Sequence, residues 1–261
     1  MKHRLRYIVP ILFLIAILAG CASVPHNSLM QVSTIGALLD GDYAGHMTCR
    51  ELLESGDFGL GTFEKLDGEM VVLDGVVYQI KADGRVYRPD KDVTTPFAVV
   101  TPFQTDRVIG LSKTTDYAGI QKIIDNESPD KGIFLAVKIT GRFPFMKTRS
   151  VPAQVQPYPR LVEVVKHQSI FELKDVSGTV VGFRSPPYVK GGINVPGYHL
   201  HFLSDDRTAG GHILEFEITE GTIELDSCNR FTMVIPEGAL VEGRPGSSGM
   251  RGSDELERVE K

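Results

Sequence analysis

The most chemically informative segment of the chain runs from His199 to His212 and holds three of its seven histidines. His199 and His201 are separated by one residue within the alternating sequence Tyr-His-Leu-His-Phe. Because strand side chains alternate between the two faces of a sheet, both imidazoles point to one face, with Cα atoms about 7 Å apart. His212 opens the next apolar segment and returns to His201 if the two segments pair. Three neutral imidazoles with open coordination positions are typical of a catalytic metal site.

Two observations favour a plainer interpretation of these histidines. An isolated His-X-His pair is common on half-exposed strands, and His212 is expected on one apolar face with Leu214, Phe216 and Ile218, where a core histidine would also fit. The return of a third histidine through a hairpin favours metal binding over a half-exposed His-X-His pair and over a core histidine. The other four histidines have no such partners in sequence: His3, His26, His46 and His167.

The N-terminus has the parts of a secretory signal, a basic head followed by an apolar run and small residues. The apolar run is shorter than the ~20 residues of a membrane span. The sequence Leu18-Ala19-Gly20-Cys21 resembles the bacterial lipobox, whose cysteine is lipidated and begins the mature protein. We therefore predict a signal peptide over 1–20, a lipidated Cys21, a tether over 21–30 and an exported lipoprotein on the periplasmic or extracellular face of a membrane. A plain signal peptide or an uncut anchor helix is the alternative.

Two further cysteines, Cys49 and Cys228, would fold in an oxidising compartment. They could form a disulfide, but their spacing does not tell whether they meet, and two isolated buried thiols fit as well. The chain has no Cys-X-X-Cys motif, so a thiolate metal site is not expected.

Composition is that of an ordinary globular protein, with 42% apolar and 23% charged residues. The net charge is −5, and lysines and arginines are scattered along the chain. This pattern lacks the basic patch of a nucleic-acid-binding protein, so we expect no nucleic-acid partner.

Hydrophobic periodicity and turn signals predict the elements that position the histidines. Asp74-Gly75 is a strong hairpin signal between two apolar runs, and apolar residues at helical spacing predict an amphipathic helix over 116–125. Predicted strands are 69–73, 76–80, 97–101, 133–139, 178–183, 197–203, 212–218, 221–225 and 231–235, and further helical segments are 49–55 and 161–167.

Several uncommon strings are distributed along the mature part of the chain. They are Gly56–Phe63 with Leu66–Met70, Lys147–Arg149, Thr179–Phe183, Gly197–Phe202 with Gly210–His212, and the opening Gln31–Thr34 with Leu38–Gly41. Together they resemble the signature sequences of the acetolactate decarboxylase family, from about Gln31 to the C-terminus. The resemblance implies Zn²⁺-dependent conversion of 2-acetolactate to acetoin and CO₂.

Carried over by position, the resemblance assigns roles to individual residues. It makes His199, His201 and His212 the zinc ligands. It makes Arg149 and Glu69 catalytic and places Thr62 in the substrate-binding wall. A glutamate of the C-terminal tail completes the family's site, and we favour Glu257 for this catalytic role over Glu255 and Glu260.

The fold that the resemblance implies is α/β (α+β), with two mixed β-sheet halves, flanking helices and an extended tail. The metal site lies at the sheet of the C-terminal half. A Pro-rich stretch over 152–159 is the best boundary, which predicts an N-terminal half over 31–155, a C-terminal half over 156–245 and a tail over 246–261. A homodimer is compatible with this arrangement.

The expected chemistry follows from the substrate. Loss of CO₂ from a β-keto acid leaves an electron pair that needs a sink. A Zn²⁺ that chelates the ketone oxygen and the neighbouring hydroxyl would stabilise the resulting enediolate as a Lewis acid, without an organic cofactor. Arg149 would orient the substrate carboxylate or support negative charge, and Glu69, the tail glutamate or a metal-bound water could supply the proton.

Two other functions compete with this interpretation. A cupin-like dioxygenase or isomerase also carries His-X-His on a strand, but it normally has a glutamate soon afterwards and a third histidine much farther away. A non-catalytic metal-binding lipoprotein would keep the three histidines but would not need Arg149, Glu69 and Thr62.

Overall fold

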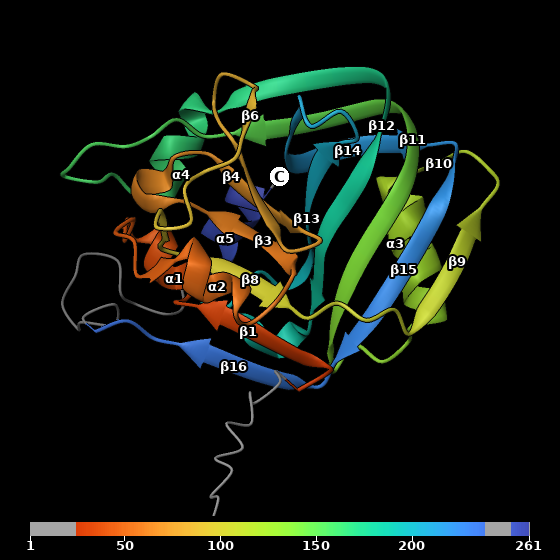
Figure 1. Cartoon of the computed structure of the whole chain (residues 1–261), viewed down its shortest axis with the longest axis horizontal. Coiled ribbons are helices and arrows are strands. Elements are labelled where there is room, and N and C mark those ends of the chain that lie inside the picture. The colour runs from red at the N-terminus through yellow and green to blue at the C-terminus, as the bar shows by residue number, and fades with distance from the viewer. Residues whose placement is uncertain (1–24, 238–251, 261) are drawn as a thin grey trace, which may run out of the picture.

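The computed structural model describes residues 25–237 and 252–260, although the side chains of residues 252–254 and 257 lie outside the description. The chain folds into two seven-stranded sheets with a few short helices around them (Figure 1). The predicted signal peptide, the predicted lipidation site Cys21 and the first part of the predicted tail lie outside the described residues. No helix in the described part of the chain combines the length and the apolar character needed to cross a bilayer.

The first sheet is antiparallel except where β1 pairs with the edge strand β16 in parallel. Its strands in spatial order are β16 (Arg230–Val234), β1 (Ser28–Val32), β8 (Ala98–Thr101), β3 (Phe58–Thr62), β4 (Glu69–Leu73), β5 (Val76–Ile80) and β6 (Val86–Tyr87). A separate two-stranded ladder joins β2 (Met47–Thr48) to β7 (Thr94–Thr95).

The second sheet is antiparallel throughout and contains the longest strands. Their spatial order is β10 (Thr115–Asp116), β14 (Gly210–Ile218), β13 (Gly197–Ser204), β12 (Ser169–Ser185), β11 (Phe134–Ser150), β15 (Glu220–Cys228) and β9 (Arg107–Leu111). The first part of β11 pairs with β15, whereas its last part pairs with β14. Because β14 also pairs with β13, the four strands β11 to β14 close on themselves at one end of the sheet.

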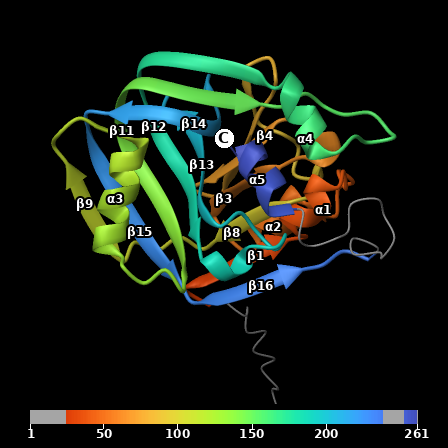
Figure 2. The same cartoon turned by 180° about the vertical axis from the view of Figure 1, so that it is seen from behind.

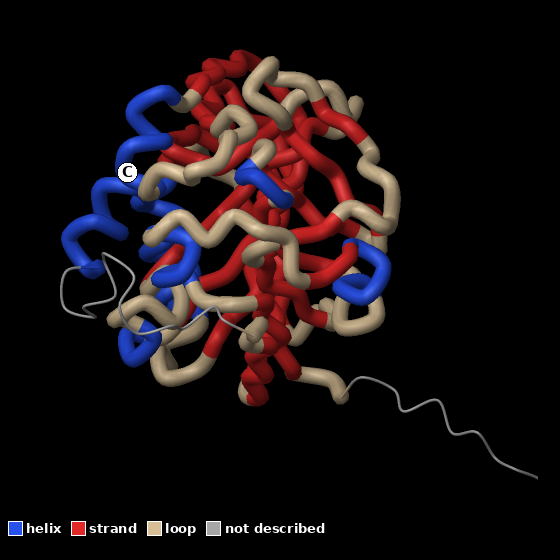
Figure 3. The backbone as a smooth tube through the Cα atoms, turned by 90° about the vertical axis from the view of Figure 1, so that its left-hand side faces the viewer, coloured by secondary structure: helices blue, strands red, loops and turns tan. Residues whose placement is uncertain are grey.

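The sheets and helices stack in layers around three groups of buried apolar side chains. The largest group lies between the two sheets and includes residues of α1 (Ile35–Leu39), α4 (Leu161–Val164) and α5 (Gly252–Glu260). A second group lies under α3 (Tyr117–Glu127), which covers the outer face of the second sheet (Figure 2). The third lies under α2 (Cys49–Leu53) on the outer face of the first sheet. The helices gather mainly along the side of the molecule where α5 ends (Figure 3).

Local sequence signals explain several elements. Asp74 and Gly75 have φ values of 51° and 73°, the left-handed conformation that a two-residue hairpin turn of this kind requires, so the predicted hairpin is confirmed. The predicted helix over 116–125 forms as α3, and the Asp116 carboxylate caps it by accepting a hydrogen bond from the Gly119 amide. Its residues Ile120 and Ile124 are fully buried, as helical spacing requires.

The structure differs from the sequence predictions in three ways. The first sheet begins at Ser28, inside the range predicted as a tether, because β1 is hydrogen bonded on both sides. The strands predicted over 133–139 and 178–183 extend to seventeen residues each. The two sheets do not divide at residue 155, because β11 precedes that point in the chain, β12 follows it, and the two strands pair with each other.

The prediction that His212 shares one face of its strand with Phe216 and Ile218 is wrong. Ile213, Phe216 and Ile218 lie together in the core under α3, whereas His212 points the other way. The cause is an irregularity in the β11–β14 ladder, where Leu214 is an extra residue between the pairs Thr148–Ile213 and Lys147–Glu215. Such a bulge interrupts the alternation of side chains, so a sequence pattern of period two fails across it.

Cys49 and Cys228 are both free and buried, and they are not bonded to each other. They belong to core groups on opposite faces of the first sheet. The alternative of two isolated buried thiols is therefore the one that the structure supports.

Candidate metal centre

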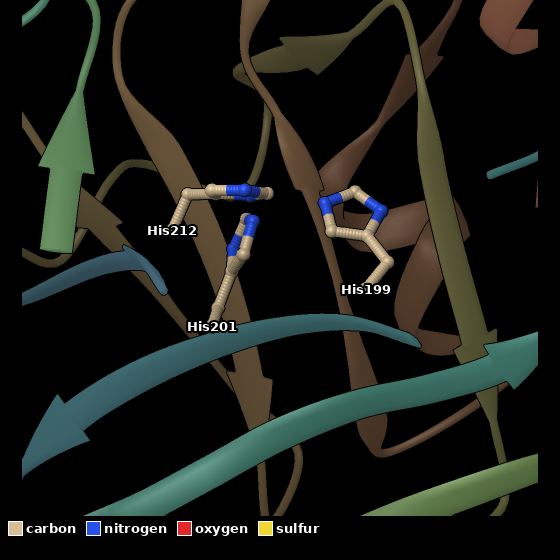
Figure 4. Close-up of side chains that lie close together, drawn as sticks. All are labelled: His199, His201 and His212. Atoms are coloured by element: carbon tan, nitrogen blue, oxygen red, sulfur yellow. The ribbon is translucent and has the colours of Figure 1, made fainter. Parts of the chain in front are cut away.

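The three predicted histidines converge on the inner face of the second sheet (Figure 4). His201 on β13 lies directly opposite His212 on β14 in the ladder, and His199 lies two residues before His201 on β13. One nitrogen from each ring lies within 4.8 Å of the others, and all three residues are buried. The hairpin return that the sequence predicted is confirmed, and among the described residues this is the group that could hold a metal ion.

The protonation state of the imidazoles suits a cation. Nδ1 of His201 lies 2.8 Å from the Met70 carbonyl oxygen. A carbonyl can only accept, so Nδ1 carries the hydrogen and Nε2 keeps its lone pair for a ligand bond. This Nε2 and the Nδ1 atoms of His199 and His212 are buried without a hydrogen-bond partner among the described residues.

Burial lowers the pKa of all three imidazoles, that of His199 to about 3, and the nearby Arg149 guanidinium lowers each of them further. They are therefore neutral at neutral pH, which is the form that binds a metal. A buried set of neutral imidazoles with unpartnered nitrogens is costly unless a cation satisfies it, so the donor set fits a divalent ion.

A buried ion pair borders the histidines on the side of the first sheet. Arg149 Nη1 donates to Glu69 Oε1 at 3.2 Å, and Glu69 Oε2 lies 3.6 Å from His201 Nε2. Thr62 is the cross-strand partner of Glu69, and its hydroxyl donates to the Gly68 carbonyl at 2.7 Å. The predicted residues Arg149, Glu69 and Thr62 therefore come together with the histidines, from three strands in two sheets.

The C-terminal helix closes another side of the site. Glu260 Oε2 lies 3.7 Å from His212 Nε2 and 3.8 Å from His199 Nε2, and the Val259 carbonyl accepts from Arg149 Nη2 at 3.1 Å. Glu255 instead pairs with Arg160 at 2.7 Å. Of the tail glutamates whose side chains are described, Glu260 is the one at the site, while the side chain of the favoured Glu257 lies outside the described residues.

The two carboxyl groups at the site can hold protons near neutral pH. Burial raises the pKa of Glu69 to about 7; the Arg149 charge opposes this shift, and Glu260 adds to it. Burial also raises the pKa of Glu260 to about 7, again against the charge of Arg149. Carboxyl groups poised near the working pH are suited to general acid–base catalysis.

Polar and apolar walls enclose a small cavity of about 40 Å³ at this point. The histidines, Glu69, Arg149, Thr62 and Glu260 supply the polar side. The apolar side is formed by Ile35, Leu38, Leu66, Phe97, Val151, Leu161 and Val259. The lining, with a few convergent polar groups among apolar side chains, is that of a small-molecule site, while the cavity itself has room for about one water.

Sequence reasoning missed the two backbone carbonyls of the site, those of Met70 and Val259. No side-chain pattern could indicate them. The sequence does indicate that the tail docks as a helix, because Leu256 and Val259 are apolar residues at helical spacing in a charged segment. Both are buried.

A family model described as alpha-acetolactate decarboxylase matches residues 29–240. The chain belongs to the alpha-acetolactate decarboxylase family. A family member from Methanosarcina mazei is 47% identical over 233 residues, which are 89% of this chain and 80% of that protein. A member from Brevibacillus brevis is 42% identical over 212 residues, which are 81% and 74% of the two chains.

The fold of the family is the fold of this chain. The crystal structure of alpha-acetolactate decarboxylase from Bacillus subtilis strain 168 superposes with a TM-score of 0.85 at 34% identity, and the match covers 89% of this chain and 99% of that one. The predicted pair of sheets, with the three histidines on the C-terminal one, is confirmed. Family membership also excludes the cupin-like alternative.

Proposed function

We propose that this protein decarboxylates 2-acetolactate to acetoin and CO₂ at the His199–His201–His212 site, with Zn²⁺ as the metal. The observation that carries the proposal is the convergence of three neutral imidazoles, a buried arginine and two carboxyl groups with raised pKa in one cavity. Curated relatives that are named alpha-acetolactate decarboxylase support the choice of reaction.

The three histidines would hold the zinc ion through one ring nitrogen each. Bound there, zinc would supply Lewis-acid stabilisation of the negative charge that develops on the substrate oxygens when CO₂ leaves. Imidazole ligands suit zinc, and three protein ligands leave coordination positions open for a substrate.

Arg149 is placed to orient the reacting carboxylate. Its guanidinium is buried, and its Nε has no hydrogen-bond partner among the described residues. A planar guanidinium matches a carboxylate, and its charge would favour binding of the anionic substrate. As the bond to the carboxyl carbon breaks, that carboxylate becomes neutral CO₂ and the charge moves onto the remaining four-carbon unit.

One proton must then be added to the carbon that lost CO₂, which balances the reaction of an acetolactate anion and a proton to acetoin and CO₂. Among the described residues, Glu69 and Glu260 are the carboxyl groups placed to supply this proton, since both line the cavity beside the histidines and burial raises the pKa of each. They flank the histidines from different sides, Glu69 near His201 and Glu260 near His199 and His212. Protonation from one of these sides would determine the stereochemistry of acetoin.

We further propose that the enzyme is exported and held to a membrane by lipid on Cys21. The support is the lipobox-like Leu18–Cys21 behind a basic and apolar segment. Stable anchoring requires more than one acyl chain, at ~0.8 kcal/mol per buried CH₂. Mass spectrometry of the mature N-terminus tests this, and an intact Met1 or cleavage beyond Cys21 would contradict it. A homodimer stays a prediction, which light scattering of the purified chain can test.

The decisive experiment measures acetoin formation from racemic acetolactate by the full chain, with and without a chelator. We expect activity that the chelator removes and that added Zn²⁺ restores. Metal bound without acetoin formation would instead favour the non-catalytic metal-binding lipoprotein.

A further inference from the structure

The C-terminal helix α5 supplies one wall of the proposed active site. It carries Glu260, near His199 and His212, and Val259, whose carbonyl accepts from Arg149. It lies beside α1 and α4 (Figures 1 and 2). The position of the Glu260 carboxyl group therefore depends on how firmly α5 is docked.

The helix cannot hold its place by its own stability. It has nine residues, fewer than the ~12–15 at which isolated helices become even marginally stable in water. Leu256 and Val259 bury apolar side chains in the core between the sheets. Apolar contacts alone are non-directional, so they do not determine the rotation of a short helix as a directed polar contact does.

Arg160 provides such a directed contact near the start of α5, in addition to the hydrogen bond that Arg149 donates to the Val259 carbonyl near its end. Its Nη2 donates to Glu255 Oε2 on α5 at 2.7 Å and to Asp40 Oδ1 at 3.1 Å. Asp40 is the C-cap of α1, and Arg160 itself is the N-cap of α4, so the guanidinium lies where three helices meet. The Glu255 and Asp40 side chains are 12% and 19% exposed, whereas the Arg160 side chain between them is 41% exposed.

The loss of Arg160 would do more than remove one attraction. Two carboxylates lie within hydrogen-bonding distance of the same guanidinium nitrogen. Without the positive charge between them, the two partly shielded carboxylates of Asp40 and Glu255 would repel each other at close range. This repulsion would push α5 away from α1 and from the histidines, which distinguishes the contact from an ordinary exposed ion pair.

We propose that Arg160 is a positioning residue of the decarboxylase, which holds α5 through Glu255 and so keeps Glu260 and the Val259 carbonyl at the metal site. The inference rests on the proposed function, because Glu260 matters only if the site is catalytic. Arg160 itself does not line the cavity, so its effect on the reaction is indirect.

The test uses the full chain loaded with zinc. Three variants, Arg160→Gln, Glu255→Ala and the double variant Arg160→Gln/Glu255→Ala, are compared with the parent and with a control variant, Arg50→Gln. Arg50, which lies on α2, is the matched control, since it forms a solvent-exposed ion pair with Asp92 at 2.8 Å. We expect Arg160→Gln and Glu255→Ala to lower kcat by about five- to tenfold, in proportion to the fraction of molecules with α5 docked. Zinc content should stay at that of the parent, and Arg50→Gln should match the parent in kcat.

Two readouts separate positioning from a general loss of stability. Hydrogen exchange of the peptide 252–260 should be faster in Arg160→Gln and Glu255→Ala than in the parent, with little change in the sheets. In a Glu260→Gln background, Arg160→Gln should lower kcat less than it does in the parent, because part of its effect passes through Glu260. The double variant Arg160→Gln/Glu255→Ala should likewise be no slower than the slower of its two single variants.

Three results would overturn the proposal. They are parent-like exchange of α5 in Arg160→Gln, a kcat within twofold of the parent despite faster exchange, and an equal loss of kcat with and without Glu260. If the parent forms no acetoin, the proposed function fails on its own, and the exchange measurement still decides whether Arg160 holds α5.

Discussion

Arg149 lies directly opposite His212 in the β11–β14 ladder, sixty-three residues away in the sequence. His212 in turn lies opposite His201 on β13, so one cationic side chain and two imidazoles follow each other across three adjacent strands. The bulge at Leu214 allows this row, because it turns His212 toward the space between the sheets while Ile213 and Phe216 stay in the outer core. A substrate carboxylate bound by Arg149 would therefore lie beside the metal ligands.

Replacing any one of the three histidines by alanine should abolish stoichiometric zinc binding. Each ring supplies one of three nitrogens within 4.8 Å of each other, so a single deletion leaves too few protein ligands for an open site. Metal analysis of His199→Ala, His201→Ala and His212→Ala measures this, with His167→Ala at an exposed position as the control. Full occupancy in two of the three variants would show that the site is assigned wrongly.

Arg149→Ala and Glu69→Gln should keep zinc but lose activity. Neither residue is needed as a ligand if three imidazoles hold the ion, whereas both contact the place where the substrate would bind. We expect kcat to fall by ~10²-fold or more, which corresponds to ~2.7 kcal/mol of transition-state stabilisation. Zinc content, Tm and acetoin formation should be measured on the same preparations.

A suitable control for Arg149→Ala lies on the same strand. Arg142 is exposed, and its weak ion pair with Asp175 at 3.8 Å lies away from the site, so Arg142→Ala should behave as the parent does. Should Arg149→Ala and Glu69→Gln both decarboxylate within threefold of the parent, the metal site alone would have to carry the reaction.

The two candidate tail glutamates can be separated by parallel substitutions. Glu260→Gln removes the carboxylate that, among the described residues, lies beside His199 and His212, and it should lower kcat by ~10-fold or more, since a proton donor is lost while the shape is kept. Glu257→Gln tests the assignment that the family resemblance favoured. A large loss in Glu257→Gln with parent-like kinetics in Glu260→Gln would reverse the assignment in favour of Glu257.

Asp226→Asn should stabilise the protein at alkaline pH more than at acidic pH. Asp226 is fully buried, one carboxylate oxygen accepts from the Gln104 amide, and the other has no partner among the described residues. Burial raises its pKa from 3.8 to about 6, and the nearby Asp106 and Asp57 add to the shift. The native state therefore binds this proton more tightly than the unfolded chain does.

The stability that this proton contributes is complete below pH 3.8 and is lost as pH rises through about 6. Asparagine has no such dependence, so the variant should gain roughly 1–3 kcal/mol relative to the parent between pH 4 and pH 8. Urea unfolding at several pH values measures the gain, with the exposed Asp205→Asn as the control. An equal difference between variant and parent at all pH values would contradict the assignment.

The sequence by itself determined the parts of the protein that depend on neighbouring residues. The spacing of His199 and His201 placed two imidazoles on one strand face, Asp74-Gly75 specified a hairpin, and Ile120 with Ile124 specified the buried side of α3. These features follow from the period of a strand or helix and from turn stereochemistry, which act over a few residues. The family resemblance then assigned Arg149, Glu69 and Thr62 to the same site as the histidines, without showing how they come together in space.

Tertiary structure alone decided how these pieces meet. The pairing of β11 with both β15 and β14 brings Arg149 to His212, and no local pattern encodes a contact between strands so far apart in the chain. The bulge at Leu214 reverses the faces that simple alternation predicts, because its extra residue is accommodated only when β14 pairs with β11. The charged tail becomes a helix in the site because Leu256, Val259 and Glu255 find their partners in elements folded from distant parts of the sequence.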